Sequence, residues 1–247
     1  MSGHSKWSKV KHQKETTDAA KGKVFTKFAN AITIAVGEGG SPDPNFNFKL
    51  RLAIDKARSY NMPKENIERA IERARGGEEG GTLQEAVYEA FAPGGVGVII
   101  EAATNNKQRT VSELKNILER GGGVLAASGS VSHFFKYVGL ITVAKDKKSF
   151  DEIMEAAINA GATDISDAGE YVEIFTEPSS LHKIKEALIA FGLSVSSSEL
   201  DYHPITTIPI EKKETAAQIL KLLSAIEDMD DVQKVYANFD IPDEYIK

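Results

Sequence analysis

The chain has 247 residues, 41% hydrophobic and 27% charged, which is long enough for two or three compact domains with the composition of an ordinary soluble protein. It contains no cysteine, which excludes disulfides, a thiolate nucleophile and cysteine-based metal sites and fits a reducing cytosol. The segment after Met1 is polar and no stretch approaches the roughly 18 apolar residues of a membrane span, so we expect a cytoplasmic protein with no membrane partner.

The charge is divided unevenly along the chain. Residues 1–76 carry 15 Lys+Arg and 8 Asp+Glu, a net +7, whereas residues 77–247 carry 15 Lys+Arg and 28 Asp+Glu, a net −13. The two parts add up to the −6 of the whole chain. A basic end on an acidic body is expected where one part of a protein meets a polyanion, and a solvated basic arm is the alternative.

The first part of the chain has the spacing of three helices. Apolar residues recur at helical intervals over residues 18–36, a second helix is predicted over 47–60, and Pro63 opens a third that runs to the region of Arg75. The segment GGEEGG, residues 76–81, is typical of a linker. We therefore predict a basic N-terminal arm and a three-helix domain over residues 1–76.

After the linker the apolar pattern acquires the period of strands. The segments LQEAVYEAFAP and VGVIIEAAT flank Gly94 and Gly95, which predicts a hairpin. Thr110 and Glu113 have the spacing of a capping box and predict the start of a helix. Residues 122–132 have small side chains and predict a flexible segment.

From residue 133 onward the patterns follow the order strand, helix, strand, strand, helix, strand, with Ser149 and Glu152 as a second capping box. This order predicts an inserted ferredoxin-like α/β domain over residues 133–202. The segments after it are too small to fold alone, so residues 82–132 and 203–247 should form one discontinuous α/β domain. The predicted fold class is α+β: an N-terminal helical domain followed by two α/β domains with ferredoxin-like antiparallel sheets, the third inserted in the second.

The chain lacks the common catalytic and cofactor motifs, including the P-loop, the dinucleotide-binding glycine pattern, the nucleophile elbow and the metalloprotease helix. The acidic residues of segment 164–173 fall where a hairpin needs polar turn residues. We predict no enzyme, no catalytic residue, no metal site, no cofactor and no small-molecule substrate. The five histidines are scattered without ligand-spaced partners: His4, His12, His133, His182 and His203.

Two polar segments have features of anion sites. The segment TNNKQRT places polar groups at a predicted helix N-terminus, where backbone N–H groups can meet an anion; a plain helix cap with an exposed arginine is the alternative. Its candidate anion-site residues are Thr104, Asn105, Asn106, Arg109 and Thr110. The glycine-rich segment 120–132 could hold phosphate on its amides, but it lacks the lysine of a P-loop, and loop or interdomain packing is our interpretation.

The basic N-terminal region is the strongest signal in the chain. Its cations can neutralise phosphates, and Trp7 can stack on an unpaired base or pack against the helical domain. The residues that we expect to face a nucleic acid on these grounds are Lys6, Trp7, Lys9, Lys11, His12, Lys14, Lys21, Lys23, Lys27, Arg51, Arg58, Arg69 and Arg73.

Four segments resemble the YebC family: GHSKW at 3–7, NMPKENIERAI at 61–71, PGGVGVIIEA at 93–102 and GSVSHFF at 129–135. The resemblance covers essentially the whole chain, and several long motifs in the same order make it specific. The family comprises bacterial proteins classed as DNA-binding transcriptional regulators and a mitochondrial translational activator of cytochrome c oxidase. Some members are implicated at ribosomes stalled on proline-rich sequences.

The resemblance implies a helical domain followed by two α/β domains. It also implies that the motif positions of the first domain face the nucleic acid. Beyond the cations already named, these positions are Gly3, His4, Ser5, Asn61, Lys64 and Asn66.

The leading hypothesis is a non-enzymatic, nucleic-acid-binding regulator of gene expression, with the DNA-binding transcriptional role that the resemblance implies. The alternative is a ribosome- and RNA-associated translation factor that helps translation through proline-rich stalls, with ribosomal or transfer RNA as its partner. Lysines that bind phosphate do not distinguish DNA from RNA, and no helix-turn-helix pattern is evident, which favours RNA. A third class, an enzyme that uses the Arg109 loop, rests on the anion-site geometry alone.

Overall fold

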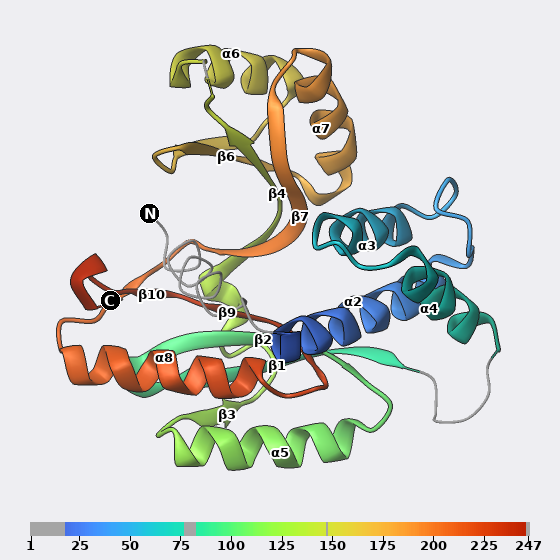
Figure 1. Cartoon of the computed structure of the whole chain (residues 1–247). Helices are drawn as coiled ribbons and strands as arrows, with labels where there is room; N and C mark the ends of the chain where they lie inside the picture. The colour runs from blue at the N-terminus through green and yellow to red at the C-terminus, as the bar shows by residue number, and fades with distance from the viewer. Residues whose placement is uncertain (1–17, 77–82, 147, 246–247) are drawn as a thin grey trace. The chain divides into compact units, whose positions relative to one another are not determined.

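The computed structural model describes residues 18–76, 83–146 and 148–245. These residues form two compact units, one of residues 136–203 and one of the segments on either side of it (Figure 1). Helices come first, followed by two antiparallel sheets that carry helices, which confirms the predicted α+β class. Within the described ranges, no helix is long and apolar enough to cross a membrane. The three domain boundaries stay a prediction, and the linker at 77–82 lies outside these ranges.

The three predicted helices are present. Their buried faces form one cluster that includes Ile32, Leu50, Ile54 and Ile67. The Asn47 side chain accepts a hydrogen bond from the Leu50 amide and donates to the carbonyls of Ala35 and Ser41, at 2.7 and 2.8 Å. The buried side-chain amide of Asn47 therefore caps the N-terminus of the second helix and fixes the turn that follows the first. The helices are α2 (Asp18–Gly39), α3 (Phe48–Ser59) and α4 (Lys64–Gly76).

The larger unit also contains a four-stranded sheet of order β3-β1-β2-β9, whose neighbours are all antiparallel. The chain segments on either side of the smaller unit build this sheet together, because β9 pairs with β2 from Val98 to Ala102. A short parallel pair, β8 with β10, lies outside it. The elements are β1 (Gln84–Ala92), β2 (Val96–Thr104), α5 (Lys107–Arg120), β3 (Val124–Ala126), β8 (Ile208–Pro209), α8 (Lys213–Glu227), β9 (Val232–Ala237) and β10 (Phe239–Asp240).

The two faces of this sheet are covered by different helices. Val98 and Ile100 of β2 face α5 and α8 and join Leu114 and Ile219 in the largest buried cluster. Ile99, between them in sequence, points to the opposite face with its register partner Tyr236, and both are fully buried. Helix α2 contacts β2 and β9 and contributes nothing to the first cluster, so it lies on that opposite face.

The structure corrects two local predictions in this unit. The predicted capping box at Thr110 and Glu113 is wrong, because α5 begins at Lys107 and its N-cap is Asn106, which accepts a hydrogen bond from the Arg109 amide. The segment 122–132, predicted to be flexible, contains β3, which pairs with β1. The predicted hairpin is confirmed, and Gly94 and Gly95 at its turn both have a φ of 78°.

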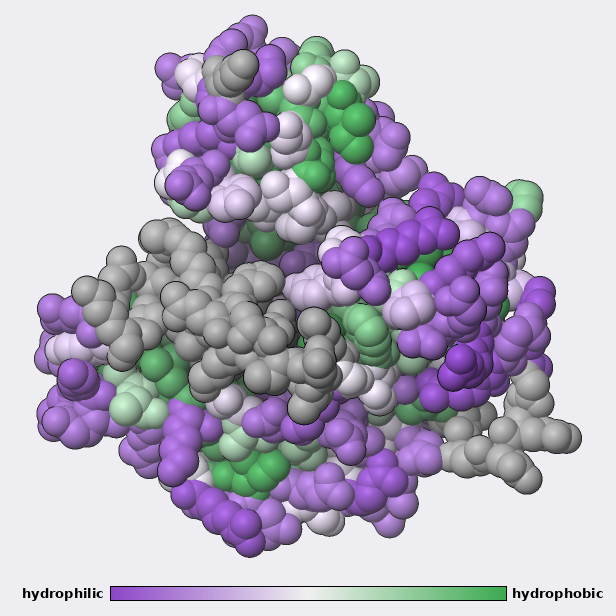
Figure 2. Space-filling view, viewed as in Figure 1, coloured by the Kyte–Doolittle hydropathy of each residue, from purple (hydrophilic) through white to green (hydrophobic). Residues whose placement is uncertain are grey.

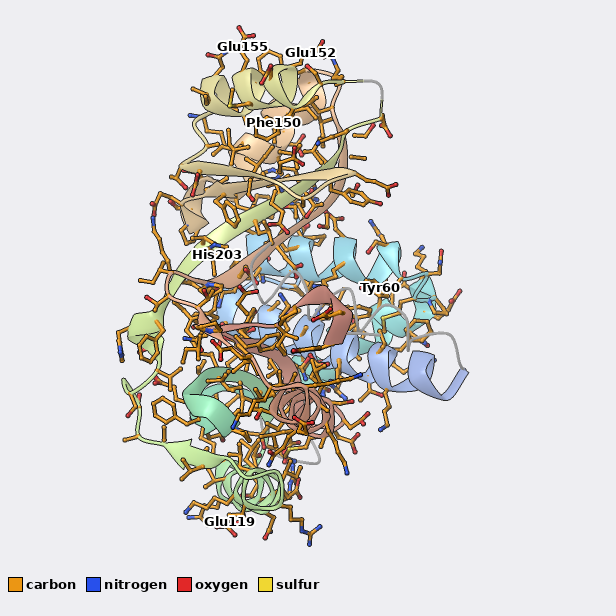
Figure 3. All side chains as sticks on the ribbon, turned by 90° about the vertical axis from the view of Figure 1, so that its left-hand side faces the viewer. Tyr60, Glu119, Phe150, Glu152, Glu155 and His203 are labelled. Carbon is orange, nitrogen blue, oxygen red and sulfur yellow. The ribbon has the colours of Figure 1, made fainter. Side chains whose placement is uncertain are left out.

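The smaller unit has the ferredoxin-like order that the sequence predicts. Its strand order is β5-β6-β4-β7, and the Ser149–Glu152 capping box is confirmed at the start of α6. Phe150 lies on the sheet side of α6, whereas Glu152 and Glu155 point away from it (Figure 3). The elements are β4 (Phe135–Ala144), α6 (Phe150–Ala160), β5 (Asp164–Asp167), β6 (Tyr171–Thr176), α7 (Leu181–Ala190) and β7 (Ser194–Pro204).

A buried carboxylate fixes the loop before β4. Glu89 of β1 is 7% exposed and accepts hydrogen bonds from the amides of Gly129, Val131 and Ser132. Burial raises the pKa of Glu89, but these amide bonds outweigh it and the net direction is below the ordinary value of 4.5. Opposite the loop stands Gly97, where a Cβ atom would come within 2.8 Å of Val131 Cγ1. The glycine-rich segment thus binds an anion from its own chain.

We predict that Glu89→Gln destabilises the larger unit by about 1–3 kcal/mol, because an amide places N–H donors against N–H donors in a buried site. Because the folded pKa of Glu89 is lowered, its contribution is present above pH 4.5 and is lost as the pH falls through the folded pKa. The variant should therefore show a flatter loss of stability in acid. Urea unfolding between pH 3 and 7, with the exposed Glu119→Gln as control, measures both effects; identical curves for the two variants would contradict the role of Glu89.

We also predict that the inserted unit, about residues 133–203, folds without the larger unit, whereas the larger sheet requires the C-terminal strands. Truncation after Tyr202 removes α8 and β9 and should abolish amide-exchange protection over Val96–Ala103 while sparing the smaller unit. Replacing residues 137–200 with a short Gly/Ser linker removes the smaller unit and should leave the amide-exchange protection over Val96–Ala103 intact. Protection that persists in β2 of the truncated chain would show that β9 is dispensable.

Candidate nucleic-acid interface

Part of the predicted interface lies outside the described residues: Gly3, His4, Ser5, Lys6, Trp7, Lys9, Lys11, His12 and Lys14. Lys21 belongs to the first turn of α2. The remaining predicted cations and polar groups are distributed over α2, α3, α4 and the turns that join them.

Two predicted lysines of α2 contact the C-terminal end of α8. The Lys27 ammonium donates to the Glu227 carbonyl at 2.6 Å, and the Lys23 ammonium lies 3.3 Å from the Asp228 carboxylate. The first turns of α2 and the last turn of α8 lie side by side (Figure 1). Both lysines therefore have a partner at the acidic end of α8.

Arg51 and Arg73 are engaged in holding the helices together. The Arg51 guanidinium donates to the carbonyls of Pro44 and Asn45, both at 3.0 Å, and so fixes the turn between α2 and α3. The Arg73 guanidinium donates to Asn30 and Thr33 of α2, at 2.9 and 3.0 Å. These two arginines link elements of the helical part and have fewer free donors for a ligand.

Arg58, Lys64 and Arg69 are exposed, and Arg58 and Arg69 make no side-chain hydrogen bond or ion pair with another residue of the described ranges. Lys64 lies 3.4 Å from Glu68 one turn along α4, in an exposed pair that contributes little. The outer side of α3 and α4 is mostly hydrophilic (Figure 2). Among the predicted interface cations, Arg58 and Arg69 are thus exposed and without a side-chain partner in the described ranges.

The motif residues at 61–63 form the turn between α3 and α4. Asn61 has a φ of 58°, its amide donates to the Arg58 carbonyl, and the Met62 amide donates to the Ala57 carbonyl. This is the Schellman arrangement of a helix end, with Met62 buried beneath it. The Pro63 carbonyl then accepts from the amides of Asn66 and Ile67 at the start of α4. Asn61 therefore has a structural role in this turn, whatever its side chain contacts.

The candidate anion site at 104–110 holds a carboxylate of the same chain. Asp231, in the turn between α8 and β9, accepts hydrogen bonds from Thr110 Oγ1 at 2.7 Å, Arg109 Nη2 at 2.9 Å and Thr104 Oγ1 at 3.2 Å. The Asn106 amide donates to Thr104 Oγ1 at 2.9 Å, and Asn105 is exposed beside it. The structure brings all five predicted residues together and places an internal anion among them.

The electrostatics of this cluster favour the ionised carboxylate. Burial raises the pKa of Asp231, but the bonds from Arg109 and the two threonines outweigh burial and lower it. The same hydrogen bond raises the pKa of Arg109. The network joins the end of β2, the first turn of α5 and the turn before β9. No pattern local to residues 104–110 could have identified Asp231 as the anion.

The acidic segment 164–173 forms the hairpin of β5 and β6, as predicted from its turn residues. Asp167 at its turn accepts hydrogen bonds from the Lys145 ammonium and the Gly169 amide. In the ranges that the structure describes, no group of three or more His, Asp or Glu side chains is placed to hold a metal ion.

Comparison with known proteins connects this arrangement to one family. Residues 5–77 match the family described as the TACO1/YebC protein N-terminal domain, and residues 83–239 match the TACO1/YebC second and third domain. A protein of Sulfurihydrogenibium sp. named as a probable transcriptional regulatory protein is 50% identical over 248 residues, with 100% of this chain and 98% of the relative covered. A protein of Aquifex aeolicus, also named as a probable transcriptional regulatory protein, is 44% identical, with 100% and 99% covered.

A solved structure agrees with the sequence comparison. The crystal structure of a conserved hypothetical protein from Aquifex aeolicus superposes with a TM-score of 0.83 at 43% identity and covers 92% of this chain and 93% of its own. The family matches extend over most of the sequence and include the three helices and both sheets. The chain therefore belongs to the TACO1/YebC family.

Proposed function

We propose that the chain is a non-enzymatic, cytoplasmic regulator of gene expression that binds nucleic acid through residues 1–76. The observation that carries the proposal is the charge distribution: a +7 segment, with exposed Arg58 and Arg69 on its helices, precedes a body of net −13. Such a segment attracts a polyanion, while the acidic body repels one. The names of the Sulfurihydrogenibium and Aquifex relatives support a regulatory role.

Two of the described polar clusters are satisfied within the chain and fit a non-enzymatic role. The clusters around Asp231 and Glu89 both have internal partners, and the pKa of each carboxylate is lowered. A general base at neutral pH needs a raised carboxylate pKa and access to a substrate. Both carboxylates instead serve to join segments of the chain.

Transcriptional regulation through DNA is the first form of this proposal, because the relatives are named as probable transcriptional regulatory proteins and such regulation commonly acts on DNA. RNA binding in translation is the second, and the surface of α4 favours it. That helix exposes Glu65, Glu68 and Glu72 among its cations, and carboxylates on this face would lie close to phosphates if α4 entered a DNA groove. Phosphate contacts from the N-terminal lysines and from isolated arginines suit an irregular RNA surface as well as a duplex.

Crosslinking in cells, followed by sequencing of all bound DNA and RNA, separates the two forms. Enrichment of promoter DNA supports the transcriptional form, and enrichment of ribosomal or transfer RNA supports the translational form. A chain that lacks residues 1–17 is the control, because it keeps the described helices and removes the N-terminal lysines. Equal recovery of nucleic acid with both chains would remove residues 1–17 from the proposed interface.

We predict that Lys6, Lys9, Lys11 and Lys14 dominate the salt dependence of binding. Replacing all four with Ala should weaken binding on every sequence tested, because fewer counterions are released from the nucleic acid. The slope of log K against log salt should become shallower by about 0.7–0.9 for each phosphate that the variant no longer neutralises. Fluorescence anisotropy titrations between roughly 50 and 200 mM salt measure the slope.

A matched control removes the same charge elsewhere, by replacing the exposed lysines Lys115, Lys183, Lys213 and Lys221 with Ala. Its slope should stay close to that of the wild type. If the two quadruple variants behave alike, net charge alone governs binding and the N-terminal segment is not the contact site.

We further predict that the four arginines expected at the interface divide into two pairs. Arg58→Ala and Arg69→Ala should weaken binding with little change in melting temperature, because neither guanidinium bonds to a described residue. Arg51→Ala and Arg73→Ala should lower the melting temperature, because both guanidinium groups join separate elements. Thermal melts beside binding curves measure both effects, and a drop in stability in the first pair would contradict the division.

A further inference from the structure

The α8 helix ends in the segment EDMDD, residues 227–231, which carries four carboxylates in five positions. The C-terminal end of a helix already bears partial negative charge on its unpaired carbonyls, so carboxylates there are destabilising unless cations lie nearby. The last turn of α8 contains no basic residue of its own. Its compensating charge has to come from other elements.

Three cations from other elements meet this segment. Lys27 donates to the Glu227 carbonyl at 2.6 Å, Lys23 lies 3.3 Å from Asp228, and Arg109 donates to Asp231 at 2.9 Å. All three cations are among those that the sequence predicts to bind an anion or a nucleic acid. The segment 227–231 therefore occupies, within the chain, groups that a polyanion would use.

The three interactions differ in how readily they can exchange. The Asp231 side chain is 15% exposed and accepts hydrogen bonds from three side chains, so an external anion cannot easily replace it. The side chains of Lys23 and Asp228 are 55% and 68% exposed, in a single ion pair that water and salt can screen. Exchange with an external phosphate is thus favoured at Lys23, whereas Lys27 is half-buried against the Glu227 carbonyl.

We propose that Asp228, the C-cap of α8, is an intramolecular competitor for nucleic acid that occupies Lys23 until a phosphate replaces it. The proposal rests on the proposed function and adds its regulation. The competitor lowers the affinity for a polyanion by the strength of one exposed ion pair, and a ligand that also engages the rest of residues 1–76 more readily offsets that cost. Weak, non-specific binding of phosphate is thereby reduced.

The experiment compares Asp228→Asn with Asp230→Asn. Asp230 is exposed, lies two positions away and makes no side-chain contact with another described residue, so its variant changes the net charge equally without releasing a lysine. Anisotropy titrations with a labelled single-stranded RNA and a labelled DNA duplex, near 50 mM salt, should show Asp228→Asn binding about 2- to 5-fold tighter than Asp230→Asn, the range of an exposed ion pair. The difference should shrink as salt is raised.

A double-mutant cycle with Lys23→Ala tests the mechanism, because the gain from Asp228→Asn should disappear when Lys23 is absent. Equal affinities of the two Asn variants, or a gain that persists without Lys23, would overturn the competitor while leaving nucleic-acid binding intact. If the wild-type chain and both variants bind neither probe, the proposed function itself fails and the competitor fails with it. Thermal melts of each variant, expected within about 2 °C of the wild type for exposed surface changes, establish that folding is not the cause.

Discussion

The strand β2 is the element on which the larger unit depends. It is hydrogen-bonded on one edge by β1 and on the other by β9, from a segment more than 100 residues later in the chain. Val98 and Ile100 pack on one face and Ile99 on the other, all fully buried. Pairing on both edges satisfies the backbone of this apolar strand, and its two faces are the surfaces that α5 and α8 on one side and α2 on the other cover.

Internal carboxylates hold the ends of the elements that surround β2. Glu89 binds the loop amides before β4, Asp231 joins the end of β2 to α5, and Asp228 meets α2. In each case an acidic side chain satisfies backbone amides or cations from a distant segment. Part of the negative charge of residues 77–247 is thus explained by carboxylates that have structural roles. In the proposed function, the same negative charge would direct a polyanion to the basic residues 1–76.

Local sequence patterns correctly predicted the structural elements that are determined by residues close together in the sequence. The three helices, the hairpin at Gly94 and the capping box at Ser149 all follow from spacings of a few residues. The start of α5 could not be predicted in this way, because Asn106 and Thr110 are both good N-cap residues. In the structure Asn106 is the N-cap, and the Thr110 hydroxyl donates a hydrogen bond to Asp231. Likewise β3 has only three residues and exists through pairing with β1. Pairings between segments far apart in the chain leave no local signal.

The same limit explains why charge alone proposes residues 1–76 as an interface without saying which of their cations would form it. Arg51, Arg58, Arg69 and Arg73 look alike in sequence, yet Arg51 and Arg73 tie elements together while Arg58 and Arg69 remain available. A guanidinium with several donors stabilises whichever acceptors lie nearest, including carbonyls of its own fold. Net charge therefore indicates which part of a chain attracts a polyanion, whereas the individual cations that stay available depend on the partners that folding gives them.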